Sequence, residues 1–145
     1  MLDDAEGDRW RQAASEALEA ARSNTMAGWH NWACMISEQA AQLAVKGLLH
    51  TVGRGDVARG HDLLRLVDAA AETAGLDVGG QIRAAAGRLV RHYQPTRYPD
   101  ALPGGTPHSS YSAADAERAL DDAAAVVGAV DRTKAALADA ERDSS

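Results

Sequence analysis

Residues 33–49 read Ala33-Cys-Met-Ile-Ser-Glu-Gln-Ala-Ala-Gln-Leu-Ala-Val-Lys-Gly-Leu-Leu49, and this stretch decides the fold. Only Glu38 and Lys46 are charged in it, and its apolar residues recur at helical spacing on one face and also occupy the others. A helix that is apolar nearly all round lies either at the centre of a bundle or at a subunit interface. We therefore predict a helix over about Met26–Thr51, with Asn24 or Thr25 as its N-terminal cap.

The composition extends this prediction to the whole chain. Among 145 residues there are 32 alanines, two isoleucines and no phenylalanine. Alanine is the best helix former, whereas β-branched and aromatic residues favour strands. The predicted fold is therefore all-α, an antiparallel up-and-down bundle of four to five helices. A chain of this length has enough residues for one domain with its own core, and we expect a single domain over residues 1–145.

Four further helices are predicted around the central one, over residues 8–23, 61–74, 81–93 and 113–140. Gly75 is predicted to end the third helix in a left-handed conformation, and Ser112 with Asp115 forms a capping box for the last helix. Residues 94–111 contain all four prolines and form a long loop, which we expect to be ordered and functional. Residues 141–145 are predicted to fray.

Several classes of protein are excluded by the sequence. No apolar run approaches the roughly 18 residues of a membrane span, and the N-terminal residues are acidic where a signal peptide is basic and then apolar. A single cysteine, Cys34, excludes an intramolecular disulfide and a multi-cysteine zinc site. We expect a cytoplasmic protein with no metal, no cofactor and no membrane contact.

Charge is distributed unevenly along the chain. The formal net charge is −6, yet residues 78–99 contain no acidic residue. The arginine and tyrosine residues of this segment can bind a phosphate through paired hydrogen bonds and can stack on a nucleic-acid base. Arg88 and Arg91 have the alternative role of solvating the outer face of a helix. Arg97 lies between Pro95 and Pro99, in a loop that the prolines make rigid.

Four segments, taken in order, resemble the HEPN family of small helical prokaryotic domains that occur beside nucleotidyltransferases. They are Trp10–Ala21, Ser37–Leu49, His61-Asp-Leu-Leu-Arg-Leu66 and Tyr93-Gln-Pro-Thr-Arg-Tyr-Pro-Asp-Ala-Leu102. The resemblance extends over nearly the whole chain. It departs at Gln42-Leu43, where family members usually carry a Glu-Lys pair.

This resemblance implies a nucleotide- or nucleic-acid-binding module that forms a homodimer and acts with a nucleotidyltransferase partner. Its ligand would be a nucleotide or RNA. The residues proposed for the phosphate are Lys46, Arg91, Arg97 and Tyr98, while Glu38 and Gln42 form a polar seam in the second helix and Asp100 supports the loop.

A second interpretation is a metal-independent ribonuclease, the toxin of a toxin–antitoxin pair. Ribonucleases of the broader superfamily carry an arginine followed after four to six residues by a histidine. Arginine stabilises the phosphorane charge, and histidine transfers the proton. Only Arg54 and His61, with six residues between them, meet this spacing, and His92 is a further catalytic candidate. A third interpretation is an interaction scaffold without ligand or activity.

Overall fold

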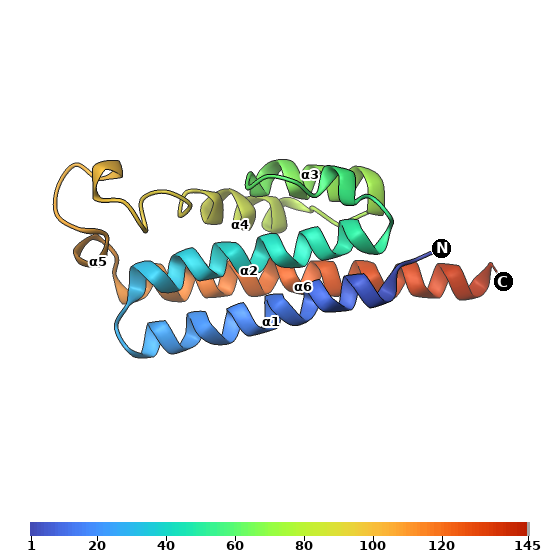
Figure 1. Ribbon diagram of the computed structural model, residues 1–145, viewed down its shortest axis with the longest axis horizontal. Coiled ribbons are helices and arrows are strands. Elements are labelled where there is room, and N and C mark those ends of the chain that lie inside the picture. The colour runs from blue at the N-terminus through green and yellow to red at the C-terminus, as the bar shows by residue number, and fades with distance from the viewer. Residues whose placement is uncertain (145) are drawn as a thin grey trace.

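Helix α2 (His30–Thr51) lies at the centre of the computed structural model, which describes residues 1–144 (Figure 1). Helices α1 (Asp4–Met26) and α6 (Ala113–Asp143) are long, and α1 runs antiparallel to both α2 and α6. The shorter helices α3 (Leu63–Ala74) and α4 (Gly80–Val90) form a hairpin on the other side of α2. No strand occurs in residues 1–144, so the predicted all-α helical bundle is confirmed.

The nearly all-round apolar character of α2 is explained by its contacts with the other helices of the same chain. Helix α2 contacts α1, α6, α3 and α4. Its buried apolar residues lie on the faces toward these helices and join one hydrophobic cluster; they are Ala33, Cys34, Ala40, Ala41, Ala44, Val45, Leu48 and Leu49. The remaining stripe of α2, which includes Trp32, Ile36 and Leu43, is only partly buried. Of the two locations that the sequence allowed, the centre of the bundle is therefore the correct one.

The boundary between the first two helices lies later in the sequence than predicted. Helix α1 continues to Met26, and the side chains of Asn24 and Thr25 donate back to carbonyl oxygens of α1. The prediction that one of them caps the second helix is therefore wrong. The chain turns at Gly28, whose φ of 87° favours glycine. Helix α2 then begins at His30, with Trp29 at the cap position and no side-chain capping bond.

Helix α3 begins two residues later than predicted, because Asp62 and not His61 provides its cap. The Asp62 side chain accepts hydrogen bonds from the backbone of Leu64 and Arg65. At the other end Gly75 adopts the predicted left-handed conformation, with φ of 73°. Helix α4 ends at Val90, three residues earlier than predicted, so residues 91–93 lie in a turn.

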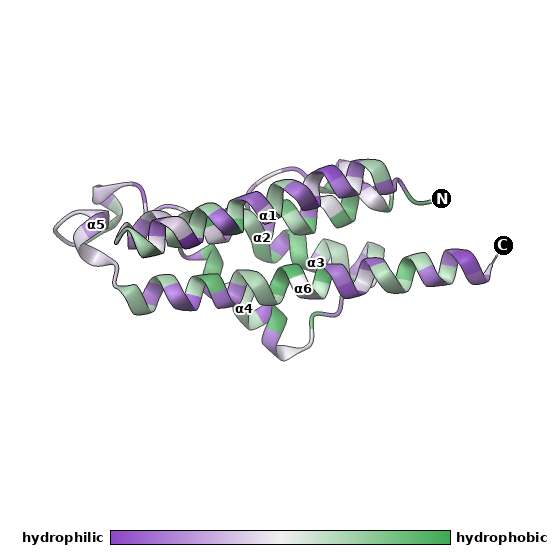
Figure 2. Cartoon of the chain, turned by 90° about the horizontal axis from the view of Figure 1, so that it is seen from below, coloured by the Kyte–Doolittle hydropathy of each residue, from purple (hydrophilic) through white to green (hydrophobic). Residues whose placement is uncertain are grey.

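The proline-containing segment 94–111 includes a 3-10 turn, η2 (Pro99–Ala101), and a short helix, α5 (Pro107–Ser110), that the sequence did not predict. The capping box of Ser112 and Asp115 then opens α6 as predicted. Helix α6 continues to Asp143 rather than ending near residue 140, and its last turns extend past the other helices (Figure 1). Figure 2 shows an apolar middle of α6 followed by a hydrophilic segment.

Two glycines allow α1 and α2 to approach closely. A Cβ atom on Gly47 would lie 2.7 Å from the Cβ of Trp10, and one on Gly7 would overlap the Oγ1 of Thr51. Both approaches are too close for real side-chain contacts. The neighbours of Gly47 also include the backbone of Gly7, which cannot rotate away.

We predict that Gly47→Ala lowers the free energy of unfolding by about 1–3 kcal/mol, because the added methyl overpacks the α1–α2 contact. Gly87→Ala in α4 is the matched control, since no atom lies within 4 Å of its added Cβ. This control should raise the free energy of unfolding by about 0.5–1 kcal/mol, the usual preference of a helix interior for alanine. Urea unfolding measures both. A stabilising effect of Gly47→Ala would contradict the close contact.

Candidate functional site

A buried carboxylate lies in the middle of α2. Glu38 has 0% of its surface exposed. The Gln42 side-chain amide donates to both of its carboxylate oxygens, at 2.8 and 2.6 Å, and the Gln39 amide donates at 2.8 Å. Burial raises the pKa of Glu38, while these hydrogen bonds and the nearby positive charges of Arg97 and Lys46 oppose that rise. Glu38 and Gln42 therefore form a buried polar seam.

The seam continues from α2 into the connection that precedes α3. This connection turns back along α2 (Figure 1), and the Gln42 amide donates to the carbonyl oxygen of His61 at 3.2 Å. The His61 Nδ1 atom lies 3.4 Å from the Gln42 Oε1 atom. The His61 ring in turn stacks on Tyr93, with ring centroids 5.4 Å apart and planes 21° from parallel. Three segments distant in sequence thus meet at His61.

Arg97 closes the turn that follows α4. Its Nε and Nη2 atoms donate to the Tyr93 carbonyl at 2.9 and 2.6 Å. Its guanidinium lies 4.5 Å from the centroid of the Tyr93 ring and 5.3 Å from that of Tyr98. Two of its donors are therefore already used inside the loop, and Arg97 orients Tyr93 as well as carrying charge.

Thr96 fixes the same turn to the rest of the bundle. It is 0% exposed, and its hydroxyl donates to the carbonyl oxygen of His92 at 2.6 Å. The Asn31 side-chain amide, at the start of α2, donates to the Thr96 carbonyl at 3.0 Å. The loop is therefore held at both the end of α4 and the start of α2, which gives Tyr93 a fixed position.

A pocket of about 420 Å³ lies beside the stacked rings. Arg91 is exposed at this pocket, and its side chain makes no hydrogen bond or ion pair with any of residues 1–144. Asp62 also lines it, with one carboxylate oxygen occupied by the cap of α3. We call this the aromatic pocket; its lining residues are His61, Asp62, Val90, Arg91, Tyr93, Gln94 and Pro95. Aromatic walls beside an unpaired guanidinium suit a planar ligand that carries an anionic group.

The other residues proposed for the phosphate lie around this centre. Tyr98 is 48% exposed, and Asp100 is exposed in η2. Lys46 is half-buried, one helical turn along α2 from Gln42. Burial lowers the pKa of Lys46, the charge of Arg65 lowers it further, and Glu38 opposes both effects. Among the four proposed residues, Arg97 and Tyr98 are adjacent, Arg97 and Lys46 both lie near Glu38, and Arg91 lies at the aromatic pocket.

Arg54 and His61 have separate surroundings. Arg54 forms two hydrogen bonds to Asp56, at 2.9 and 3.1 Å, and its backbone N–H donates to the carbonyl of Leu49. His61 lies beside Gln42. Gln42 precedes Leu49 by seven residues in α2, which corresponds to about 10 Å along the helix axis. Arg54 is paired with Asp56, and no hydrogen bond or ring contact joins its side chain to His61.

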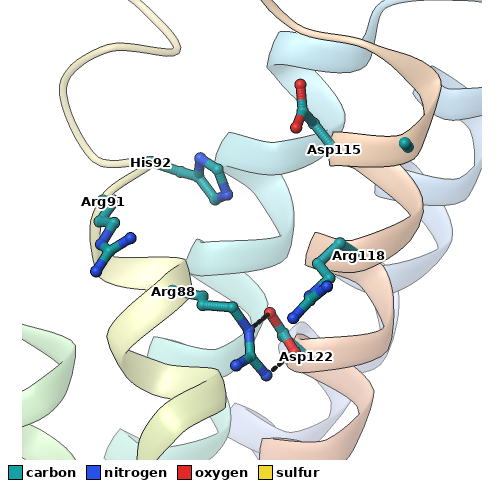
Figure 3. A pocket seen from close by; sticks show the side chains of 7 residues that line it. Arg88, Arg91, His92, Asp115, Arg118 and Asp122 are labelled. Carbon is teal, nitrogen blue, oxygen red and sulfur yellow. Dashed lines mark hydrogen bonds and ion pairs between the residues drawn. The ribbon is translucent and has the colours of Figure 1, made fainter.

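His92 lies in a second pocket, of about 360 Å³, between the end of α4 and α6 (Figure 3). Its Nδ1 atom is 3.5 Å from the Tyr111 hydroxyl, and burial lowers the pKa of His92. Arg88 forms two hydrogen bonds to Asp122 of α6, at 2.9 and 2.8 Å. Arg88 therefore joins two helices and does not merely solvate an outer face.

Two site residues were missing from the sequence-based set. Tyr93 was part of the recognised motif, but its stacking on His61 depends on a contact across 32 positions and has no local signal. Arg118 lines the second pocket from α6. Its spacing from Asp115 and Asp122 places all three on one helical face, and this spacing was the available signal.

Residues 1–144 contain no group of three histidine, cysteine, aspartate or glutamate side chains arranged to hold a metal ion. No helix in that range combines the length and apolar character needed to cross a membrane.

Comparison with known proteins identifies the class of this helical bundle. The model of the HEPN domain matches residues 8–133. The structure is similar to that of TT1696 from Thermus thermophilus, with a TM-score of 0.81 and 37% identity over 88% of this chain and 98% of that one. The chain belongs to the HEPN domain family.

Two other solved structures agree with this result. An archaeal HEPN homologue, ST0689, has a TM-score of 0.72 and 31% identity over 87% of this chain and 95% of that one. A HEPN domain protein of Thermotoga maritima, tm0613, has a TM-score of 0.68 and 27% identity over 88% of this chain and 98% of that one. No curated protein matches the chain.

We predict that protonation of Glu38 stabilises the fold. Because burial raises its pKa in the folded state, the stabilising contribution is complete below the pKa of the unfolded chain and is lost as the pH rises through the folded pKa. Relative to Glu38→Gln, the wild-type free energy of unfolding should therefore increase as the pH falls from about 7.5 to about 5.

Urea unfolding of both proteins at several pH values measures this difference. Glu16→Gln, at an exposed position of α1, is the matched control and should give a difference that does not vary over the same range. A difference between wild type and Glu38→Gln that stays constant with pH would show that Glu38 titrates normally.

Proposed function

We propose that this HEPN domain is a nucleotide-binding module whose ligand occupies the aromatic pocket. The observation that carries the proposal is the combination of the stacked His61 and Tyr93 rings with an unpaired Arg91 at the same pocket. A base gains stacking energy on aromatic side chains, and a guanidinium binds phosphate oxygens through paired, charge-assisted hydrogen bonds. Stacking of the base and binding of the phosphate need no chemical reaction, so both suit a binding module.

The charges at the pocket suggest an orientation for the nucleotide. Asp62 repels a phosphate, whereas Arg91 attracts one, so the phosphate is expected on the Arg91 side and the base on the Asp62 side. In this proposal Arg97 has mainly a positioning role, because it holds the Tyr93 carbonyl and ring. Tyr98, which is exposed next to Arg97, offers a further surface for stacking.

Membership of the HEPN family is the support for two further parts of the proposal, a homodimer and a nucleotidyltransferase partner. The faces of α2 that contact the other helices give no support for a dimer, because they are covered within the chain, whereas Trp32 on the remaining face is 40% exposed. Light scattering tests directly for the homodimer, whose mass would be twice the 15.2 kDa of the chain.

The ribonuclease interpretation has less support, since Arg54 is paired with Asp56 and His61 has other neighbours. His92 keeps this interpretation testable, because a histidine with a lowered pKa is neutral near pH 7 and can accept a proton. Cleavage of RNA that persists in EDTA and is lost in His92→Ala would favour the enzyme over the binding module. The scaffold interpretation predicts neither cleavage nor nucleotide binding.

We predict that ribonucleoside monophosphates bind the wild-type protein in isothermal titration calorimetry and that Arg91→Ala weakens this binding by about 1.5–3 kcal/mol, or roughly 10- to 100-fold. The loss follows from removal of the charge-assisted hydrogen bonds to the phosphate. His61→Ala should also weaken binding, by about 1–3 kcal/mol, through loss of the stacking surface.

Arg132→Ala is the matched control, because Arg132 is also exposed and forms no ion pair with residues 1–144, and it lies on α6 away from the lining of the aromatic pocket. Its affinity should equal that of the wild type. Absence of saturable binding by the folded wild-type protein, or equal affinities of wild type and Arg91→Ala, would reject the proposed site.

A further inference from the structure

The second pocket, between α4 and α6, has positive charge that its own carboxylates do not neutralise. Asp122 is bound by Arg88 in a two-hydrogen-bond ion pair (Figure 3). Asp115 accepts hydrogen bonds from the backbone N–H of Ser112 at 2.8 Å and from its hydroxyl at 3.0 Å, within the capping box of α6. Of the two carboxylates, only Asp122 is therefore paired with a cation; Asp115 keeps its charge, and the three arginines of the pocket still outnumber the two carboxylates.

Two arginines of this pocket remain without such partners. The side chains of Arg91 and Arg118 form no hydrogen bond or ion pair with any residue in the described part of the chain. Figure 3 shows Arg118 extending from α6 toward α4, opposite His92, with Arg91 at the rim. A pocket of about 360 Å³ with two unpaired guanidiniums, in a protein of net charge −6, is suited to a bound phosphate or similar anion.

The arginine pocket, as we name this second pocket, adjoins the aromatic pocket. Arg91 lines both of them. The two residues that follow it diverge, with His92 lining the arginine pocket and Tyr93 lining the aromatic pocket. One nucleotide would place its base in the aromatic pocket and its phosphate on Arg91. Arg118 then remains free to bind a second phosphate.

We infer that the ligand is a single-stranded nucleic acid of at least two nucleotides, with one base in the aromatic pocket and an adjacent phosphate in the arginine pocket on Arg118. This inference rests on the proposed function and specifies its ligand. A duplex does not fit, because its bases are paired and stacked and enter a protein pocket only when extruded. The ion pair between Arg88 and Asp122 links α4 to α6, the two helices that form the walls of the arginine pocket.

The test compares a fluorescein-labelled RNA octanucleotide, measured by fluorescence anisotropy, with a ribonucleoside monophosphate measured by calorimetry. Arg118→Ala should weaken octanucleotide binding by about tenfold and leave monophosphate binding unchanged. The slope of log affinity against log salt concentration for the octanucleotide should become shallower by about 0.7, because one phosphate contact is lost. Arg91→Ala should weaken the binding of both ligands.

Arg132→Ala, on the same helix as Arg118 and also exposed, should change neither affinity nor salt dependence. If Arg118→Ala leaves octanucleotide affinity and salt slope unchanged while monophosphate binding still depends on Arg91, the second phosphate site is rejected and the nucleotide site survives. Equal affinity for the octanucleotide and for its duplex also rejects the inference. If the folded wild-type protein binds neither monophosphate nor octanucleotide, the proposed function is rejected together with the inference.

Discussion

The burial of α2 over most of its surface is the constraint on which the rest of the structure depends. A helix whose apolar residues extend over most of its circumference is removed from water only if several neighbours cover it. Helices α1 and α6 cover one part of α2, and the α3–α4 hairpin covers another. Alanine and glycine at the contacts allow this close packing, as the approach of Gly47 to Trp10 illustrates. The chain therefore uses its small residues to surround one helix rather than to build a large core of aromatic side chains.

The same burial explains how the candidate site is positioned. A carboxylate in the middle of a buried helix is costly unless hydrogen bonds compensate its lost hydration. Glu38 obtains these from Gln42 and Gln39, and Gln42 also contacts His61 in the connection before α3. Satisfying the buried charge thus fixes the segment that carries His61, and the stacking of His61 on Tyr93 forms one wall of the aromatic pocket. The geometry of the surface site follows from a polar requirement of the core.

Sequence patterns predicted what local chemistry determines. The five main helices, the left-handed Gly75 and the capping box of Ser112 each depend on residues within one or two turns, and each was predictable. The end of α1 was not, because Asn24 can cap a following helix or bond back to the preceding turn, and the position of Gly28 decides between them.

Contacts across long separations were equally invisible in the sequence. The Arg88–Asp122 pair joins residues 34 positions apart, and no periodicity on either helix indicates it. The candidate site combines both kinds of information: the acid-free segment located its arginines, and only the fold separated Arg91, which is unpaired, from Arg88, which is not. In an acidic protein that distinction governs recognition. The net charge of −6 repels a polyanion at long range, so attraction depends on short-range contact with a few exposed guanidiniums. Such a surface favours a flexible strand that can place a base and a phosphate in adjacent pockets over a duplex, which binds mainly through a broad positive field.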